Sequence, residues 1–219
     1  MAQGNSNRTS EVDSNTITLG VLTAIEEDDR ATQRAISEDL GIALGLTNAY
    51  LKRCVKKGFI KVRQIPANRY AYYLTPQGFA EKSRLTAEYL SISFNFFRSS
   101  REQCAELFET CDRNRWTRVA LAGCGDLAEI ATLCQREGSG VEIIGIINTS
   151  ENGDVPQRFA GLPVVDRLTD LAKVHAVVVT DIVNAQTVYD RLSKAIPPER
   201  VLTAPLLKVS RELPRLVDD

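Results

Sequence analysis

The sequence predicts an α/β protein in two parts, a small helical module with a β-hairpin followed by a parallel-sheet domain. Residues 32–74 contain two short helical segments, a basic helix and two alternating strands, in that order. From residue 117 onward, short buried strands alternate with helices, which is typical of a parallel sheet covered on both faces. A long helical stretch between the two parts completes the predicted architecture.

The basic helix is predicted over residues 43–57. Helical spacing places one apolar stripe on the side that would face a small core, formed by Leu44, Thr47, Leu51, Cys54 and Val55. The opposite side carries small residues, one amide and two lysines: Gly45, Asn48, Ala49, Lys52 and Lys56. Arg53 flanks this polar side, and Gly58 suits a left-handed cap at the end of the helix.

A two-stranded wing is predicted directly after this helix. Residues 60–64 alternate as a strand, Pro66 to Asn68 form a turn, and residues 69–74 return as a second strand. Before the helix, residues 37–41 read as a helix end followed by a tight glycine turn. This order predicts a winged helix-turn-helix, an arrangement that places one helix in the major groove of DNA.

Double-stranded DNA is therefore the expected partner. An Asn side chain can read an adenine edge through two hydrogen bonds, and Lys can reach guanine or phosphate. The expected contact residues are Thr47, Asn48, Lys52, Arg53, Lys56, Arg63, Asn68 and Arg69. Lysines also occur on any solvated helix face, but the flanking turn and strands favour the DNA interpretation.

The charge distribution supports a DNA-binding module. The net charge of the chain is only −1, yet residues 30–101 contain 13 Lys and Arg against 4 Asp and Glu, a net of +9. Residues 1–29 and residues 102–219 each have a net charge of −5. A basic module gains affinity by releasing counterions from DNA, and the acidic parts would be kept away from the phosphates.

Composition is that of a cytoplasmic globular protein. The 219 residues, 43% of them hydrophobic, suffice for one large or two small domains, and no run of about 18 apolar residues predicts a membrane span. Residues 1–14 are polar and lack the apolar region of a signal peptide, so we expect a disordered lead-in. The predicted parts are a winged helix-turn-helix at 15–78, a helical connector at 79–115, a sheet domain at 116–208 and a tail at 209–219.

The connector is predicted to start with Thr75 as the N-cap and Pro76 at the first helical position. No Pro or Gly interrupts residues 79–116, although a break near Ser99 and Ser100 would divide the segment into two helices. Two apolar lines run along it: Leu85, Tyr89, Ile92 and Phe96, and Leu90, Phe94 and Phe97 with Cys104, Phe108 and Cys111 beyond. These side chains either pack against the protein's own domains or form the seam of a homodimer. We favour the homodimer, because DNA readers of this type usually bind paired half-sites.

In the second half, strands are predicted at 118–122, 141–147, 162–165, 174–180 and 200–203, with helices from about 126 to 137, at 169–171 and at 185–195. The run Gly123-Cys-Gly125-Asp-Leu-Ala128 lies between the first strand and the first helix, where a dinucleotide fingerprint would lie. Gly123 would allow a tight turn, Gly125 would let a pyrophosphate approach the backbone, and Ala128 would allow close packing of helix on sheet.

A nucleotide-type ligand is accordingly expected at this edge of a Rossmann-like sheet. The expected ligand-binding residues are Gly123, Cys124, Gly125, Asp126, Leu127 and Asn148. Asn148 stands where NAD-binding domains carry an acid for the ribose, which weakens the argument for NAD. A nucleotide, a nucleotide sugar and NAD(H) all stay open as cofactors, as does a sheet that binds nothing and serves assembly.

Catalysis has little support in the sequence. The single histidine, His175, begins a strand, and Asp126, Asp166 and Asp181 at strand ends suit caps and loops, without a nucleophile beside them. We expect no enzyme and no metal site; a small oxidoreductase or sugar-nucleotide enzyme with a DNA-binding leader would need a base and a pocket. The five cysteines show neither a disulfide framework nor a zinc pattern, and a thiol switch at Cys104 and Cys111 is the less favoured alternative to burial.

The N-terminal part resembles the MarR-type winged-helix regulators associated with exopolysaccharide gene clusters. The resemblance covers roughly residues 17–98 and rests on Gln33–Ser37, Leu40-Gly41, Leu44-Gly45, Asn48–Lys52, Lys57-Gly58, Tyr73–Gly78 and Glu81–Thr86. It implies a regulator of polysaccharide-related genes. Ala43 stands where such regulators often have a Ser that caps the recognition helix. The absence of this Ser should weaken the cap by about 1 kcal/mol.

The C-terminal part, over about residues 117–205, resembles the Rossmann-like leader domain of membrane polysaccharide enzymes that handle nucleotide sugars. The matching segments are Gly123–Ala128, Gly145–Ile147, Gly161–Val165 and Ala176–Val179. The order of the two parts is similar to that of the redox-sensing Rex repressors, which join a winged helix to an NADH-binding Rossmann domain. Together with the composition and the apolar connector, these resemblances lead us to expect a cytoplasmic, homodimeric regulator that senses a nucleotide or nucleotide sugar. NADH is the alternative ligand, and Asn148 argues against it.

Overall fold

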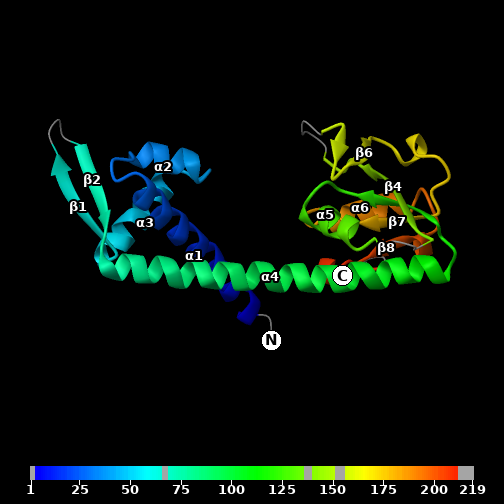
Figure 1. The fold of residues 1–219 in the computed structure, drawn as a ribbon, viewed down its shortest axis with the longest axis horizontal. Helices are drawn as coiled ribbons and strands as arrows, with labels where there is room; N and C mark the ends of the chain where they lie inside the picture. The colour runs from blue at the N-terminus through cyan, green and yellow to red at the C-terminus, as the bar shows by residue number, and fades with distance from the viewer. Residues whose placement is uncertain (1–2, 66–68, 136–139, 151–155, 212–219) are drawn as a thin grey trace, which may run out of the picture. The chain divides into compact units, whose positions relative to one another are not determined.

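The computed structural model describes residues 3–65, 69–135, 140–150 and 156–211, without the side chains of residues 3–13, 65 and 69. The chain divides into two compact units, Met1–Phe94 and Asn95–Asp219, and the division falls within one long helix (Figure 1). The first unit is helical with a β-hairpin, and the second contains a mixed, mostly parallel sheet with helices. The predicted α/β fold class is therefore confirmed.

The N-terminal unit has the predicted order of a winged helix-turn-helix (Figure 1). Its elements are α1 (Gln3–Glu27), α2 (Gln33–Asp39), α3 (Leu44–Lys56), β1 (Ile60–Ile65), β2 (Arg69–Leu74) and the start of α4 (Pro76–Arg113). The two strands are antiparallel, with Ile60 opposite Leu74 and Ile65 opposite Arg69. The predicted turn residues Pro66 to Asn68 lie outside the described residues.

One difference from the sequence prediction concerns the lead-in at residues 1–14. Helix α1 begins at Gln3, so most of that segment is helical and continues directly into a packed helix. Within α1, Val21, Leu22 and Ile25 are buried in the core of the unit. A helix fixed by such packing extends at little cost into a neighbouring polar segment that contains no proline, which composition alone does not reveal.

Helix α3 begins and ends as its sequence predicts. Its N-cap is Ala43, which makes no side-chain capping hydrogen bond. At the other end, Gly58 adopts φ 76°, a left-handed conformation, and the Phe59 amide donates to the Cys54 carbonyl at 2.9 Å. With the Gly58 amide donating to the Val55 carbonyl at 3.0 Å, this hydrogen bond ends the helix as a Schellman motif, after which the chain enters β1.

The core of the N-terminal unit buries only part of the apolar stripe predicted on α3. Leu51 and Cys54 are buried against α1, α2 and the strands, and Thr47 is fully buried with them. Leu44 and Val55, predicted to face the core, are instead 41% and 39% exposed. They lie at the borders of the stripe, where helical spacing alone does not separate inside from outside.

Thr75 joins α3, the hairpin and α4. Its hydroxyl donates to the carbonyls of Gly58, at 2.6 Å, and Phe59, at 3.2 Å, and accepts from the Gly78 amide at 3.0 Å. The Thr75 amide also donates to the Phe59 carbonyl at 3.0 Å. Thr75 with Pro76 at the first helical position is the predicted start of α4, and it is confirmed.

Helix α4 is continuous from Pro76 to Arg113. The alternative of a break near Ser99 and Ser100 is therefore wrong. Ser100 is fully buried within the helix, and Gln103 donates to the Ser99 hydroxyl at 2.8 Å, so both serines fit inside a helix. Without proline or glycine between Phe79 and Arg113, nothing in the backbone forces an interruption.

The sheet of the C-terminal unit has the strand order β5-β6-β4-β3-β7-β8. Its strands are β3 (Arg118–Ala122), β4 (Glu142–Ile147), β5 (Arg158–Phe159), β6 (Leu162–Val165), β7 (Ala176–Val179) and β8 (Val201–Thr203). Its helices are α5 (Asp126–Leu133) and α6 (Ala185–Leu192), with short 3₁₀ turns at Leu168–Asp170, Pro198–Arg200 and Pro205–Leu207. All pairings are parallel except that of β5 with β6. The two-residue strand β5 was not predicted from the sequence.

Alternating residues of the central strand pack on opposite faces of the sheet. Val119 and Leu121 pack with α5 and with Cys104, Phe108 and Cys111 of α4. Ala120 and Ala122 pack on the other side with α6, against Val188, Tyr189 and Leu192. Both faces are thus covered, as the near-continuous apolar strands predicted.

Within the described residues, no helix is long and apolar enough to cross a membrane.

We predict that Gly78→Ala destabilises the protein by about 1–3 kcal/mol, because the added Cβ would collide with the carbonyl oxygen of Phe59. Gly45→Ala is the matched control, since a Cβ there meets nothing within 4 Å and helix propensity favours alanine. Urea unfolding of the full chain, followed by circular dichroism, measures both changes. A Gly78→Ala variant as stable as Gly45→Ala would contradict the packing of this junction.

Candidate nucleic-acid interface and glycine loop

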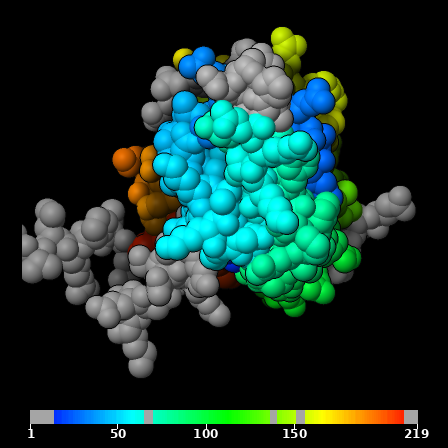
Figure 2. Space-filling model, turned by 90° about the vertical axis from the view of Figure 1, so that its left-hand side faces the viewer, coloured from blue at the N-terminus to red at the C-terminus, as the bar shows by residue number. Residues whose placement is uncertain are grey.

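One face of helix α3 points away from the core and toward solvent. Lys52 and Lys56 are exposed and Asn48 is partly exposed on this face. All three line a hollow of about 360 Å³ between α3 and the two strands of the hairpin. Figure 2 shows α3 and the strands beside each other, in neighbouring shades of cyan, on one face of the N-terminal unit. The structure therefore brings together the amide and both lysines predicted to contact DNA.

Arg53 lies at the flank of this face, as predicted, and is held there by two contacts. Its guanidinium donates to the Ser14 hydroxyl of α1 at 3.2 Å and lies 5.1 Å from the centre of the Tyr50 ring. An arginine anchored in this way is oriented away from the stripe of Asn48 and Lys52. Its exposed position still suits a phosphate contact at the edge of an interface.

Thr47 is the predicted contact that the structure contradicts. Its side chain is fully buried, and its hydroxyl faces the Ala43 carbonyl at 3.4 Å. A side chain without exposed surface cannot contact DNA. Thr47 belongs to the core side of α3, where helical spacing also placed it.

The wing residues are only partly brought to the hollow. Arg63 is exposed on β1, but strand alternation places it on the opposite face of the hairpin from Val62 and Tyr72. Asn68 and the side chain of Arg69 lie outside the described residues. The sequence prediction missed Gln33, Val62, Tyr70 and Tyr72, which line the hollow with α3. Two tyrosines and a valine spaced at every second position of the strands were the available signal.

In the C-terminal unit, the glycine loop lies at the carboxyl end of β3, as predicted. Gly123 has φ 112°, and a Cβ there would lie 2.6 Å from the Asp181 amide nitrogen. The Thr180 hydroxyl also donates to the Gly123 carbonyl at 2.7 Å. Close packing between two loops thus accounts for the glycine at this position.

Gly125 differs from Gly123. Its φ of 178° is extended backbone that any residue adopts, and a Cβ there would meet nothing within 4 Å. Neither backbone conformation nor packing within the described chain requires glycine at this place. It precedes α5, in which the Ala128 and Glu129 amides donate to the Gly125 carbonyl at 2.9 and 3.1 Å, while the amides of Asp126 and Leu127 come before the first helical hydrogen bond. A Cβ at Gly125 would meet open space.

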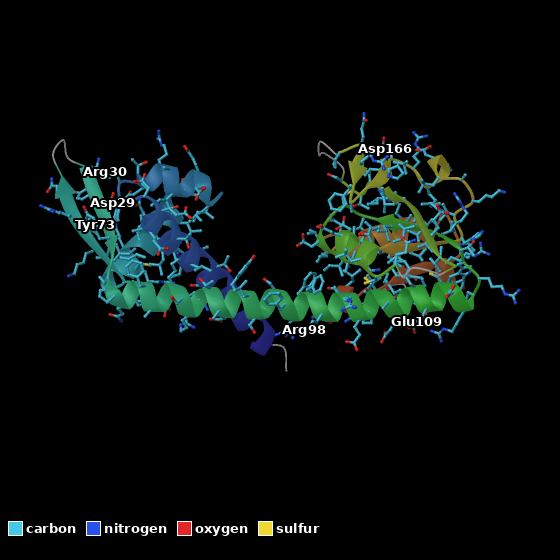
Figure 3. The ribbon with its side chains drawn as sticks, viewed as in Figure 1. Asp29, Arg30, Tyr73, Arg98, Glu109 and Asp166 are labelled. Atoms are coloured by element: carbon cyan, nitrogen blue, oxygen red, sulfur yellow. The ribbon has the colours of Figure 1, made fainter. Side chains whose placement is uncertain are left out.

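The other predicted ligand residues differ in accessibility. Cys124 is exposed in the loop, while the side chain of Leu127 is fully buried, so only its backbone could contact a ligand. Asn148, at the end of β4, donates to Asp166 at 3.2 Å and accepts from the Ser150 amide at 2.9 Å. Asp166, labelled in Figure 3 at the end of β6, is exposed, so an amide and a carboxylate from neighbouring strands meet at this edge. Sequence reasoning had assigned Asp166 to a loop.

Asp181 lies at the same edge, after β7. Its carboxylate accepts from the Thr149 hydroxyl at 2.7 Å and from the amides of Val183 and Asn184 at 3.0 and 2.7 Å. Burial alone would raise the pKa of Asp181, but these hydrogen bonds together lower it below its ordinary value. The charged carboxylate thus holds the loop before α6 and ties β4 to β7 across the end of β3.

His175 lies at the opposite edge of the sheet, just before β7. Its Nδ1 accepts from the Arg118 amide at 3.2 Å and lies 3.3 Å from the Thr117 hydroxyl. The glycine loop lies at the carboxyl ends of the parallel strands, so His175 is at the wrong end to act there. Over the part of the chain that the structure describes, no group of three His, Cys, Asp or Glu residues could hold a metal ion.

The cysteines of α4 are core residues. Cys104 and Cys111 are buried, and burial raises the pKa of each thiol to about 12. Thiols with such pKa values stay protonated and unreactive near neutral pH. This environment favours packing over the thiol switch.

Comparison with known proteins bears on the N-terminal unit. Residues 14–61 match the winged helix-turn-helix DNA-binding family. The N-terminal unit is a winged helix-turn-helix DNA-binding domain. The matched segment runs from within α1 to the start of β1 and contains the whole of α3. No curated protein and no solved structure gives a significant match to the chain.

We predict that Lys52→Ala combined with Lys56→Ala weakens DNA binding. The slope of log K, the DNA association constant, against log salt concentration should become shallower by about 2, because two lysines that reach DNA phosphates are lost. Arg191→Ala with Lys194→Ala removes two exposed charges from the other unit and is the matched control. Fluorescence anisotropy with duplex DNA at several salt concentrations measures both slopes. Equal slopes for the two double variants would contradict the assignment of this face.

Proposed function

We propose that this DNA-binding regulator is a cytoplasmic homodimer that controls polysaccharide-related genes and responds to a nucleotide or nucleotide sugar bound by a Rossmann-like C-terminal domain. It is not an enzyme in this proposal. The gene class and the ligand class come from the resemblances described above. The physical support comes from the edge of the sheet and from the surface of α4.

Gly125 is the observation that carries the ligand proposal. A glycine that neither its conformation nor its neighbours require leaves the backbone accessible at the start of α5. A phosphate could approach the first-turn amides there, where the helix dipole favours negative charge. Any side chain at this position would occupy that approach.

The meeting of Asn148 and Asp166 supports a sugar or ribose beside the phosphates. A carboxylate and an amide at the ends of adjacent strands offer acceptors and a donor for vicinal hydroxyl groups. This pair also keeps the NAD(H)-responsive repressor as the second candidate, because Asp166 supplies the carboxylate that is missing at position 148.

Ligand control requires that the ligand prefers one DNA-binding state over the other. We expect one of UDP, UDP-glucose, ATP, NAD⁺ and NADH to bind the full chain in calorimetry and to change its DNA affinity about tenfold, a typical coupling of about 1.4 kcal/mol. Gly125→Val should weaken that binding more than tenfold, because valine tolerates extended backbone and fills the approach. Thr169→Val, on an exposed turn, is the control.

Two outcomes would contradict this proposal. If DNA affinity is the same with every nucleotide that binds, the domain does not control the reader. If no small molecule binds, and mass spectrometry finds none released from the purified protein, the C-terminal unit serves assembly alone.

The homodimer is supported by exposed apolar side chains on α4. Within the N-terminal unit, Tyr89, Leu90, Ile92 and Phe94 are each at least 45% exposed, and Phe94 reaches 60%. Such a concentration on one helix is typical of an interaction surface. Two-fold pairing would also present two copies of α3 to paired half-sites.

We predict that the 24.2 kDa chain sediments as a dimer and that Phe94→Glu shifts it toward the monomer, because a charge would be buried in the seam. Leu133→Glu, at an exposed leucine of the other unit, is the control. Sedimentation velocity over a range of concentrations measures both. A monomeric wild-type protein, or a dimer that tolerates Phe94→Glu, would contradict a seam at this part of α4.

A further inference from the structure

The hollow beside α3 has an apolar interior and a polar rim. Asn48, Lys52, Lys56 and Gln33 supply the polar groups, and the remaining lining is apolar or aromatic: Leu51, Val55, Val62, Tyr70 and Tyr72. Leu51 and Tyr72 form a closed floor, since both are buried and the Tyr72 hydroxyl accepts from Gln33 at 2.9 Å. The floor of the hollow is therefore set by buried side chains of α3 and β2.

The walls of the hollow are apolar and exposed. Val55, Val62 and Tyr70 are 39%, 43% and 53% exposed, and the polar residues beside them are two amides and two lysines. When DNA covers this face, water leaves the apolar walls. A phosphate against them would lose its hydration without a hydrogen-bond partner, which is unfavourable. An apolar group of the DNA would instead gain from the contact.

Spacing along α3 places this apolar wall in line with the polar groups. Asn48, Lys52, Val55 and Lys56 stand at positions i, i+4, i+7 and i+8 and form one stripe. Asn48 and Val55 are separated by roughly 10 Å along the helix at 1.5 Å per residue. That distance corresponds to about three base pairs at 3.4 Å per step.

Thymine carries the one apolar group that bases display in the major groove, its C5-methyl. We infer that Val55, with Val62 and Tyr70, forms a receptor for a thymine methyl group about three base pairs from an adenine read by Asn48. The inference rests on α3 being the helix that enters the major groove. It adds a second sequence-specific contact to the one that Asn48 makes with adenine, whereas lysines on phosphates do not distinguish sequences.

The test begins with selection of duplexes from a random pool by the full-length protein. We expect the selected sites to share a thymine about three base pairs from a fixed adenine. Uracil is then placed at that thymine, which removes only the methyl group. The dissociation constant of the wild-type protein should rise about fourfold, equivalent to about 0.8 kcal/mol.

The same pair of duplexes is measured with Val55→Ala and with Val62→Ala, both at exposed positions where folding should persist. Each variant should show a smaller uracil effect than the wild type, whereas Val183→Ala, an exposed valine of the other unit, should keep the full effect. No uracil effect in the wild type, or the same effect in Val55→Ala and Val62→Ala, would overturn the inference. Equal weakening of thymine and uracil duplexes by Val55→Ala would assign the hollow to the sugar–phosphate backbone. Failure of the wild type to select any sequence would instead overturn sequence-specific DNA recognition by this chain.

Discussion

The hydroxyl of Thr75 connects the end of α3, the start of β1 and the start of α4. It bonds to the carbonyl groups of Gly58 and Phe59, where α3 ends and β1 begins, and accepts from the Gly78 amide at the start of α4. The backbone of Gly78 lies so close to Phe59 that no side chain fits between them. Since one residue caps α4 and holds the base of the hairpin, the angle between the wing and α3 is set locally. The hollow beside α3 depends on that angle.

Much of the N-terminal fold could be predicted because its signals are local. Thr75 followed by Pro76, the left-handed Gly58 and the uncapped Ala43 each act within a few residues. Burial was predicted less well. Helical spacing did not separate Leu44 and Val55 from the core, because their exposure depends on how closely neighbouring elements approach. Val55 shows the consequence: a residue assigned to packing became a member of the recognition surface.

The C-terminal strands were predicted from their apolar runs, and the glycine loop from its position after β3. The polar edge was not predicted. The contacts of Asn148 with Asp166 and of Thr149 with Asp181 join residues 18 and 32 positions apart. They arise from strand order and register, which a single sequence does not display. The two glycines of the loop also differ in a way that the sequence did not show: a Cβ at Gly123 would collide with Asp181, whereas a Cβ at Gly125 would meet nothing within 4 Å.

We propose that α3 and the wing read DNA while the C-terminal sheet stays off the phosphates, because residues 30–101 have a net charge of +9 and residues 102–219 a net charge of −5. Amide hydrogen exchange of the full chain, with and without duplex DNA, tests it most directly. The first-turn amides of Leu44 and Gly45 follow the uncapped Ala43 and should exchange rapidly in the free protein. We predict that DNA slows exchange there and in the two hairpin strands, and leaves β3, β4 and β7 unchanged. Protection centred on the C-terminal sheet, with α3 unaffected, would contradict the account.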